Sequence, residues 1–187
     1  YYGLKIQLFT YMREAISFEK KRHKGKNIVP AGLLYYNIDN PIVETRQDDD
    51  DKIEKLIRKE LRMKGVVNSN KNIISKLDLT EGTSLNIPVT VSKSGSIDAS
   101  KSKVLTTEEL MALGEYVDRE NVVKATKILD GSININPYER GQDSSCNYCP
   151  YNSVCGFSED MPGVKFRRLN SLSVEDIWCR IKEEIES

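Results

Sequence analysis

Three cysteines crowded into ten residues give the strongest chemical signal in this 187-residue chain. Cys146, Cys149 and Cys155 follow the spacing C-x2-C-x5-C. Thiolates are soft ligands that suit zinc or an iron–sulfur cluster, and ligands that are close in sequence lose less chain entropy on binding. Four cysteines in the whole chain are too few for a disulfide scaffold. The triplet therefore predicts a metal centre.

A metal centre built on this triplet lacks one ligand, because tetrahedral zinc and a cubane iron–sulfur cluster both take four. Cys179 or His23 would supply it from within the chain; otherwise the ligand lies upstream of Tyr1. His23 stands in a basic cluster at a predicted helix end, where attraction to the helix dipole explains it as well as phosphate binding would. The residues alone leave these sources open.

Gln7 and Tyr11 form a second candidate pair. Their i, i+4 spacing places both on one flank of a predicted helix, beside the apolar positions Leu4 and Leu8. A glutamine beside a buried stripe needs hydrogen-bond partners, because an unsatisfied buried amide is costly. Spacing alone is more typical of a helix-boundary glutamine and a core tyrosine than of a functional pair.

The acidic run from Asp48 to Asp51 is interpreted as a solvated loop. A run of adjacent like charges is far more often a solvated loop than a cation-binding site. The chain lacks a glycine-rich phosphate loop, the H-E-x-x-H and G-x-S-x-G motifs, and a spaced carboxylate set followed by lysine. These absences predict that the 187 residues do not complete a catalytic site on their own.

The composition indicates a globular domain. Basic and acidic residues each number 28, so no overall basic field indicates a polyanion partner. The hydrophobic share of 39% is enough for a core, and no apolar run reaches the length of about 18 residues that spans a membrane. The start without methionine indicates a segment of a longer protein, and the cysteine usage favours a cytoplasmic location.

Apolar spacing predicts the elements that would position these residues. The first helix has its buried stripe at Leu4, Leu8, Tyr11 and Ala15, and residues 28–38 form a strand buried on both faces. Further elements follow along the chain: helices at 51–63 and 72–77, an edge strand at 85–91 with Pro88 pointing outward, a long helix opened by a capping box of Thr106 and Glu109 and closed at Gly131, a short strand at Ile133 and Ile135, and a final helix at 173–186. A helix leading into a buried strand is typical of an α/β fold.

Three segments occur in an order that resembles a known family. They are residues 2–11, with YGLKIQL and Tyr11, residues 30–36, with PAGLLYY, and the cysteine triplet. Together with the links at 63–65, 130–131 and 137–138, they resemble the C-terminal part of the B subunits of AddAB-type bacterial ATP-dependent helicase–nucleases. The resemblance runs from residue 1 to about residue 169.

The resemblance implies part of a RecB-like nuclease domain of the PD-(D/E)XK class, a restriction-endonuclease-like α/β fold with a mixed sheet flanked by helices. In that family an Asp and an Asp/Glu-x-Lys pair hold Mg²⁺ and position the attacking water. These residues would fall just before Tyr1, outside the chain. Gln7 and Tyr11 match the family's Q-x-x-x-Y pattern, which implies that they line the active site and support the chemistry.

The resemblance also assigns the cysteines. Cys146, Cys149 and Cys155 match ligands of a [4Fe–4S] cluster whose fourth cysteine lies far upstream. The chain is accordingly divided into a nuclease portion at 1–143 with an inserted helical and strand region, an iron–sulfur segment at 144–169, and a terminal helix at 170–187.

The implied function belongs to a whole machine that unwinds and resects DNA ends for recombinational double-strand-break repair. The resemblance implies that an AddA-type partner supplies the ATP-driven motor of this heterodimer. The heterodimer is expected to be cytoplasmic, with no membrane partner. The fragment alone is expected not to cut DNA.

One alternative is a CRISPR-associated iron–sulfur exonuclease, which shares Q-x-x-x-Y and the triplet. Another is a non-enzymatic zinc-binding interaction module using the three clustered cysteines and Cys179.

Overall fold

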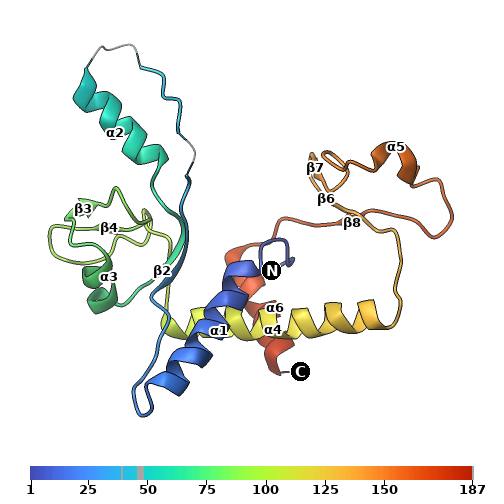
Figure 1. Ribbon diagram of the computed structural model, residues 1–187, viewed down its shortest axis with the longest axis horizontal. Helices are drawn as coiled ribbons and strands as arrows, with labels where there is room; N and C mark the ends of the chain where they lie inside the picture. Colours follow the sequence, from blue (N-terminus) through green and yellow to red (C-terminus); the bar gives the residue numbers. More distant parts are fainter. Residues whose placement is uncertain (39, 46–48, 187) are drawn as a thin grey trace. The chain divides into compact units, whose positions relative to one another are not determined.

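The computed structural model describes residues 1–38, 40–45 and 49–186, which form two compact units (Figure 1). Residues 5–117 form one unit, and residues 1–4 with 118–187 form the other. The helices are α1 (Gln7–Arg22), α2 (Asp50–Glu60), α3 (Lys71–Leu77), α4 (Thr107–Leu129), α5 (Asn152–Cys155) and α6 (Val174–Glu186). The strands are β1 (Gly32–Tyr35), β2 (Lys64–Asn68), β3 (Gly82–Thr83), β4 (Thr90–Val91), β5 (Val104–Leu105), β6 (Tyr138–Arg140), β7 (Asp143–Ser144) and β8 (Arg167–Arg168).

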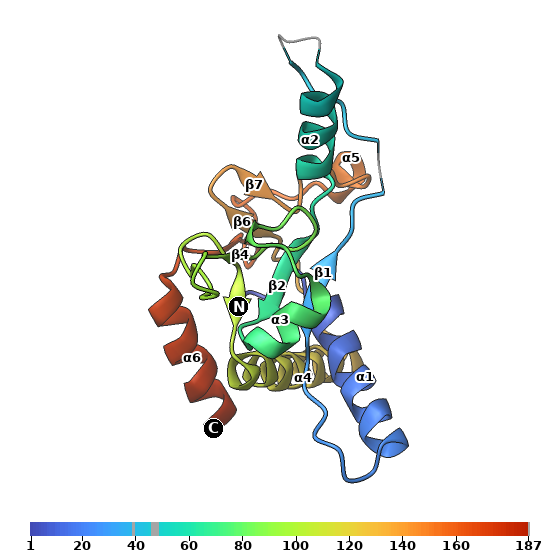
Figure 2. The ribbon, with the colours of Figure 1, turned by 90° about the vertical axis from the view of Figure 1, so that its left-hand side faces the viewer.

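The unit of residues 5–117, here called the helix–sheet unit, contains a mixed three-stranded sheet in the order β1-β2-β5 (Figure 2). β1 runs antiparallel to β2, whereas β2 and β5 are parallel. Gly65 lies opposite Leu34, with φ of 144°, and a Cβ there would lie 2.0 Å from the Leu33 carbonyl oxygen. Only glycine allows the two backbones to approach this closely. The predicted mixed sheet is confirmed.

Apolar residues of this sheet feed two core clusters, one on each face. Successive strand residues point to opposite faces, so Leu33 packs with one cluster and Leu34 with the other. The first cluster joins α1, β1 and α4 through Met12, Ile16, Leu33 and Leu110. The second joins β2, α3 and the segment before β4 through Val67, Ile74, Ile87 and Val89. The flanking of the sheet by helices is thereby confirmed.

The buried face of α1 differs from the predicted stripe. Met12 and Ile16 are the buried residues, while Tyr11 is 58% exposed and Ala15 is also exposed. Leu4 precedes the helix and is exposed as well. Of the predicted stripe, Leu8 is half-buried and packs against the core, which confirms that position. The rest of the buried face lies one residue further along, because Met12 and Ile16 continue from Leu8 at i, i+4 spacing.

Two strand predictions were too long. Within 28–38, only Gly32–Tyr35 is a strand, and of its residues only Leu33 is buried, because β1 lies at the edge of its sheet. Within 85–91, only Thr90–Val91 is a strand, and Pro88 is buried instead of pointing outward. The Pro88 carbonyl accepts a hydrogen bond from the Lys103 amide at 2.8 Å. A proline can lie inside when its missing N–H is not needed.

The capping signals of α4 are confirmed. The Thr106 hydroxyl accepts from the Glu109 amide at 3.1 Å, and the Glu109 carboxylate accepts from the Thr106 amide at 2.7 Å. At the other end, the Gly131 amide donates to the Ile128 carbonyl and the Ser132 amide to the Lys127 carbonyl. The short strand predicted at residues 133–135 is wrong; this segment has no regular structure and is exposed.

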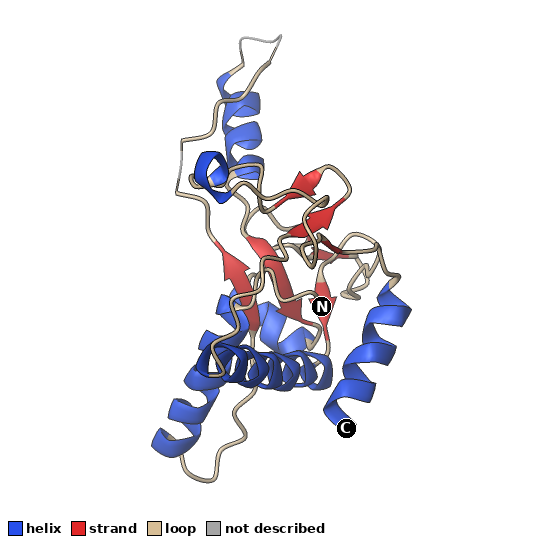
Figure 3. Ribbon diagram, turned by 90° about the vertical axis from the view of Figure 1, so that its right-hand side faces the viewer, coloured by secondary structure: helices blue, strands red, loops and turns tan. Residues whose placement is uncertain are grey.

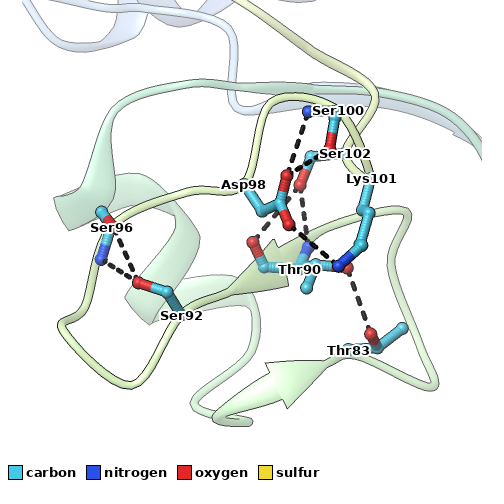
Figure 4. A network of polar contacts seen from close by, with 8 residues as sticks. All are labelled: Thr83, Thr90, Ser92, Ser96, Asp98, Ser100, Lys101 and Ser102. Atoms are coloured by element: carbon cyan, nitrogen blue, oxygen red, sulfur yellow. Dashed lines mark hydrogen bonds and ion pairs between the residues drawn. The ribbon is translucent and has the colours of Figure 1, made fainter.

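Hydroxyl groups organise the loop around β4 (Figure 4). Thr83 and Thr90 form a hydrogen bond across the β3–β4 pair at 3.2 Å, and the Thr90 amide donates to Ser102 at 2.9 Å. In the following turn, Asp98 accepts from the Ser100 amide and hydroxyl and pairs with Lys101. These local bonds satisfy the turn's polar groups without a partner from elsewhere.

The other unit, here called the cysteine unit, contains a small sheet in the order β7-β6-β8 and the terminal helix α6. Between residues 118 and 168 no residue is buried; Leu169 and Ile181 are its buried apolar residues. Figure 3 shows how much of the chain is loop, with the strands as short arrows. None of the helices in the described ranges is both long and apolar enough to cross a bilayer.

Candidate functional site

The Gln7 and Tyr11 side chains meet on one flank of α1, as their spacing predicts. The Gln7 Nε2 atom donates to the Tyr11 hydroxyl at 2.8 Å, and both residues are exposed. Gln7 is the first helical residue, so its side chain projects from the N-terminal end of α1. This position leaves the amide oxygen of Gln7 and the phenol face of Tyr11 open to a ligand.

Tyr11 also borders a cavity of about 420 Å³ between α1 and the segment that forms β1. The wall consists of one side of α1, from Leu8 to Glu19, and the backbone and side chains of residues 28–34. Most of this wall is apolar, with Tyr11 and Glu19 as its polar side chains from α1. A mostly apolar cavity with a few polar groups is the usual form of a binding site.

The surroundings of this cavity supply hydrogen-bonding groups but no metal-binding set. In residues 1–38, 40–45 and 49–186, no group of three His, Cys, Asp or Glu side chains is placed to hold a metal ion. Glu19 pairs with His23 at 3.3 Å, four residues along the helix. His23 therefore pairs locally at the end of α1, which agrees with its interpretation as a helix-end residue.

The predicted acidic loop falls partly outside the described residues, since Asp48 is among those not described. Asp49 is the N-cap of α2; its carboxylate accepts from the Lys52 amide at 3.3 Å and pairs with the Lys52 ammonium at 3.1 Å. Asp50 and Asp51 occupy the first helical turn, where negative charge favours the helix dipole. These three acids serve a helix start.

Short-range hydrogen bonds shape residues 144–169, here called the cysteine segment. The Cys146 amide donates to the Ser144 hydroxyl at 3.0 Å, and the Cys149 amide donates to the Cys146 carbonyl at 3.3 Å. Cys155 ends the one-turn helix α5, and its amide donates to the Tyr151 carbonyl at 2.8 Å. Cys146 and Cys149 are half-buried and Cys155 is exposed, and none of the three forms a disulfide.

Arg168 connects the two sides of the cysteine segment. Its guanidinium donates to Glu139 of β6 at 3.0 Å and to Glu159, which follows the cysteines, at 2.8 Å. These carboxylates, Glu139 first, raise the pKa of Arg168. The Phe157 and Phe166 rings meet edge to face with centroids 4.7 Å apart. Sequence spacing gave no signal for this arrangement, because the paired charges lie 29 and 9 residues apart.

In the described part of the chain, Cys146, Cys149 and Cys155 are not gathered into a group that could hold a metal ion. The metal centre predicted from their spacing therefore stays a prediction. Cys179 does not join the triplet; its thiol donates to Glu183 at 3.5 Å. That carboxylate raises the pKa of Cys179 and disfavours the thiolate that binds metal.

Comparison with known proteins identifies the class. The sequence model of the PD-(D/E)XK nuclease superfamily matches residues 1–156, which include the whole helix–sheet unit, the Gln7–Tyr11 pair and the three clustered cysteines. The chain belongs to the PD-(D/E)XK nuclease superfamily. The sequence-based fold prediction is thus confirmed.

A more particular similarity extends over the full chain. The B subunit of the ATP-dependent helicase/deoxyribonuclease of Clostridium botulinum strain Hall is 39% identical over 100% of this chain. The proteins of the same name from Thermoanaerobacter pseudethanolicus and Clostridium kluyveri are 36% and 35% identical over 99% and 100% of it. The chain spans 16% of the length of each of these relatives. The predicted resemblance to this type of helicase–nuclease protein is confirmed.

Proposed function

We propose that this chain is part of the nuclease domain of an ATP-dependent helicase–nuclease that degrades DNA ends. The observation that carries the proposal is the Gln7–Tyr11 hydrogen bond of 2.8 Å beside a cavity between α1 and the β1 segment. A nuclease of this class needs groups that hold the DNA backbone and orient the water near its metal. The Tyr11 phenol, which lines the cavity, and the Gln7 amide hydrogen-bonded to it can do both, by donating and accepting hydrogen bonds.

The proposed division of labour leaves metal chemistry to residues outside this chain. Mg²⁺, held by acidic residues upstream of Tyr1, would neutralise developing charge at the phosphate and lower the pKa of a bound water. Gln7 and Tyr11 then orient groups around the reacting phosphate. The described residues offer no set of metal ligands beside the cavity, so we propose that the 187-residue chain alone is inactive.

The proposed role of the cysteines is structural. Cys146, Cys149 and Cys155 would hold a [4Fe–4S] cluster together with a fourth cysteine outside the chain, which would tie the cysteine unit to distant polypeptide. Such a link stabilises the fold by closing a long loop, and it requires no redox step. The support is the absence of buried apolar residues between 118 and 168, which leaves this segment without a core of its own.

The proposed biological setting follows from the relatives. Their name includes ATP dependence and marks them as one of several subunits, so we propose an ATP-driven partner of the AddA type. The heterodimer would resect DNA ends in the cytoplasm for recombinational repair of double-strand breaks. The similarity over the whole chain favours this setting over a CRISPR-associated exonuclease, and the superfamily match favours it over a non-enzymatic zinc module.

The test of the site uses the complete two-subunit complex with linear duplex DNA, Mg²⁺ and ATP. Gln7→Ala and Tyr11→Phe should each lower the nuclease turnover roughly tenfold, because small misplacements of reacting groups are costly. ATP hydrolysis should be unchanged. Ser17→Ala, an exposed residue of the same helix, is the matched control. Full nuclease activity in both variants would contradict the assignment.

Two further measurements test the rest of the proposal. The isolated chain with linear duplex and Mg²⁺ should show no digestion, and robust digestion would refute the placement of the metal ligands. The complete protein, purified without oxygen, should absorb broadly at about 400 nm if it carries an iron–sulfur cluster. A colourless, zinc-containing protein would favour the zinc alternative.

A further inference from the structure

One side of α1 is exposed along the whole length of the helix. Counted from Gln7, exposed residues recur at i, i+4, i+7, i+11 and i+14, and this spacing places them on one face of a helix. The core residues Met12 and Ile16 project from the opposite side. The exposed face, here called the α1 flank, lies wholly in the helix–sheet unit and consists of Gln7, Tyr11, Glu14, Phe18 and Lys21. It leads from the Gln7–Tyr11 pair to the C-terminal end of α1.

Phe18 stands out in the α1 flank, because it is a large apolar ring that is 62% exposed. Tyr11, seven residues earlier on the same face, is also mostly exposed. At a rise of about 1.5 Å per residue, the two aromatic positions lie about 10 Å apart along the helix axis. Exposed rings contribute little to a core, but their faces can stack on unpaired nucleic-acid bases.

Positive charge is concentrated at the C-terminal end of the α1 flank. Residues 20–26 contain five basic residues and no acidic one, although the chain as a whole has no net charge. The five are Lys20, Lys21, Arg22, Lys24 and Lys26. Arg22 lies 3.9 Å from the Glu19 carboxylate, whereas the four lysines form no ion pair in the described part of the chain. Their charges are therefore available to an anionic partner.

Lys24 and Lys26 lie in a tight turn directly after α1. The Lys26 amide donates to the His23 carbonyl at 3.1 Å, and Gly25 between the two lysines has a φ of +81°. The end of α1 and this turn extend away from the sheet (Figure 2). The attraction of the helix dipole falls off within the last turn of a helix, so it does not account for lysines that follow the helix. Phosphate binding does, because ammonium groups that neutralise phosphates release counterions.

We propose that the α1 flank and the turn after it bind a single strand of DNA beside the Gln7–Tyr11 pair. Phe18 stacks on a base, while Lys21 and the two lysines of the turn contact phosphates. The positive charge selects a polyanion, and the exposed ring selects unpaired bases, since a duplex has no free base faces along its length. The flank is continuous with the site, because its first two members form that pair. This inference rests on the proposed nuclease role of the pair.

The dimensions and charges of the α1 flank define what it can hold. From Gln7 to Lys21 it extends about 21 Å along the helix axis, and a stacked strand advances about 3.4 Å per nucleotide, so it spans at most about six nucleotides. Glu14 carries negative charge in the middle of the flank, and it has no ion pair among the described residues. This carboxylate repels phosphates, so its removal should strengthen the binding of DNA.

The first test measures cleavage of a single-stranded oligothymidine of about 20 nucleotides, longer than the flank, by the complete two-subunit complex with Mg²⁺. Phe18→Ala should raise KM roughly tenfold with kcat unchanged, because a stacked base is lost, and Phe18→Tyr should restore the KM. Lys21→Ala should raise KM and lower the slope of log KM against log salt by about 0.7. Glu14→Gln should lower KM. Lys20→Ala removes the same charge about 100° away around the helix and is the matched control.

The second test does not depend on cleavage. Ultraviolet crosslinking of the same oligothymidine to the complex without Mg²⁺ should attach the strand to the peptide of residues 14–20, which contains Phe18. Phe18→Ala should remove this crosslink. A blunt duplex of the same length should not crosslink there, because its bases are paired. A crosslink to the duplex as strong as that to the single strand would contradict the proposed stacking.

The outcomes separate this inference from the proposed function. If Phe18→Ala and Lys21→Ala leave KM unchanged while Gln7→Ala still lowers turnover, the strand path is overturned and the nuclease assignment stands. A rise in KM in Lys20→Ala as large as that in Lys21→Ala would also overturn it, because the face of the helix would then not matter. A wild-type complex without Mg²⁺-dependent cleavage would overturn the proposed function, and the crosslinking result would still decide whether the flank binds a single strand.

Discussion

The two units of this chain are stabilised in different ways. The helix–sheet unit has two apolar clusters, one on each face of its sheet. Its last helical turns belong to the start of α4, which the capping box of Thr106 and Glu109 stabilises. The cysteine unit buries only Leu169 and Ile181 as apolar residues among those described, and it relies on charge pairs, ring contacts and short turns. A segment without a core needs another source of stability, and three adjacent thiols can supply one through a metal.

This contrast shows that residues matched by one superfamily model can be stabilised by different interactions in different parts of the chain. The matched residues 1–156 run from the apolar core of the helix–sheet unit into the cysteine segment. Mutations in the first unit should act through packing, and mutations in the second through its charge pairs and the proposed metal ligands.

The largest effect is expected from removing a proposed metal ligand. Cys149→Ser in the full-length protein should abolish the bound iron and its absorbance, because a missing thiolate leaves the site short of a ligand. Hydrogen exchange in the cysteine segment should rise sharply, while that of β1 and β2 stays unchanged. Cys179→Ser is the matched control and should keep the iron. Equal loss in both variants would show that the triplet is not the centre.

The next effect concerns the core of the helix–sheet unit. Leu110→Ala removes a fully buried side chain from the α1–β1–α4 cluster and should lower the local free energy of unfolding by about 2–5 kcal/mol. Native-state hydrogen exchange of α1 amides measures this loss. Val122→Ala, on the exposed part of the same helix, should have little effect. A similar loss at both positions would argue against a special role of Leu110 in the core.

A smaller effect is expected at Asn68, a buried polar residue at the end of β2. Its amide donates to the Pro30 carbonyl and the Thr107 hydroxyl at 2.8 Å each, and its oxygen accepts from the Asn70 amide. Asn68→Ala leaves the Pro30 carbonyl, the Thr107 hydroxyl and the Asn70 amide without this partner. It should lower the local free energy of unfolding by about 1–3 kcal/mol, measured by the same hydrogen exchange. The exposed Asn72→Ala is the control. No loss at Asn68 would mean that water replaces the bonds.

The smallest effect is a pH dependence in the turn at Asp78. Burial raises its pKa, but hydrogen bonds from Ser84, Thr80 and Asn86 outweigh this and bring the pKa to about 2, below its ordinary value of 3.8. A depressed pKa contributes stability above the unfolded value, and this is lost as pH falls from about 4 to about 2. Solvent screening keeps the contribution small.

The measurement is the pH profile of amide exchange in residues 80–87. Wild-type protection should fall over that acidic range, whereas Asp78→Asn should show lower protection with a flatter profile. Asp98→Asn changes a different turn and should leave residues 80–87 as in the wild type. An unchanged slope in Asp78→Asn would assign the pH dependence to another group.

Sequence alone determined the features that depend on neighbours in the chain. The capping box of α4, its end at Gly131, the pairing of Gln7 with Tyr11 and the start of the last helix at Ser173 are set by residues at most five apart. The metal assignment of the triplet is equally local, and it remains a prediction.

Tertiary structure decided which faces are buried and which distant groups meet. Met12 and Ile16, not Tyr11 and Ala15, face the core, because the sheet and α4 lie on that side of α1. Pro88 lies inside because its carbonyl meets the Lys103 amide. Arg168 bridges Glu139 and Glu159, and α6 holds Tyr1 across 183 positions. Such contacts depend on the path of the whole backbone, which local periodicity does not encode.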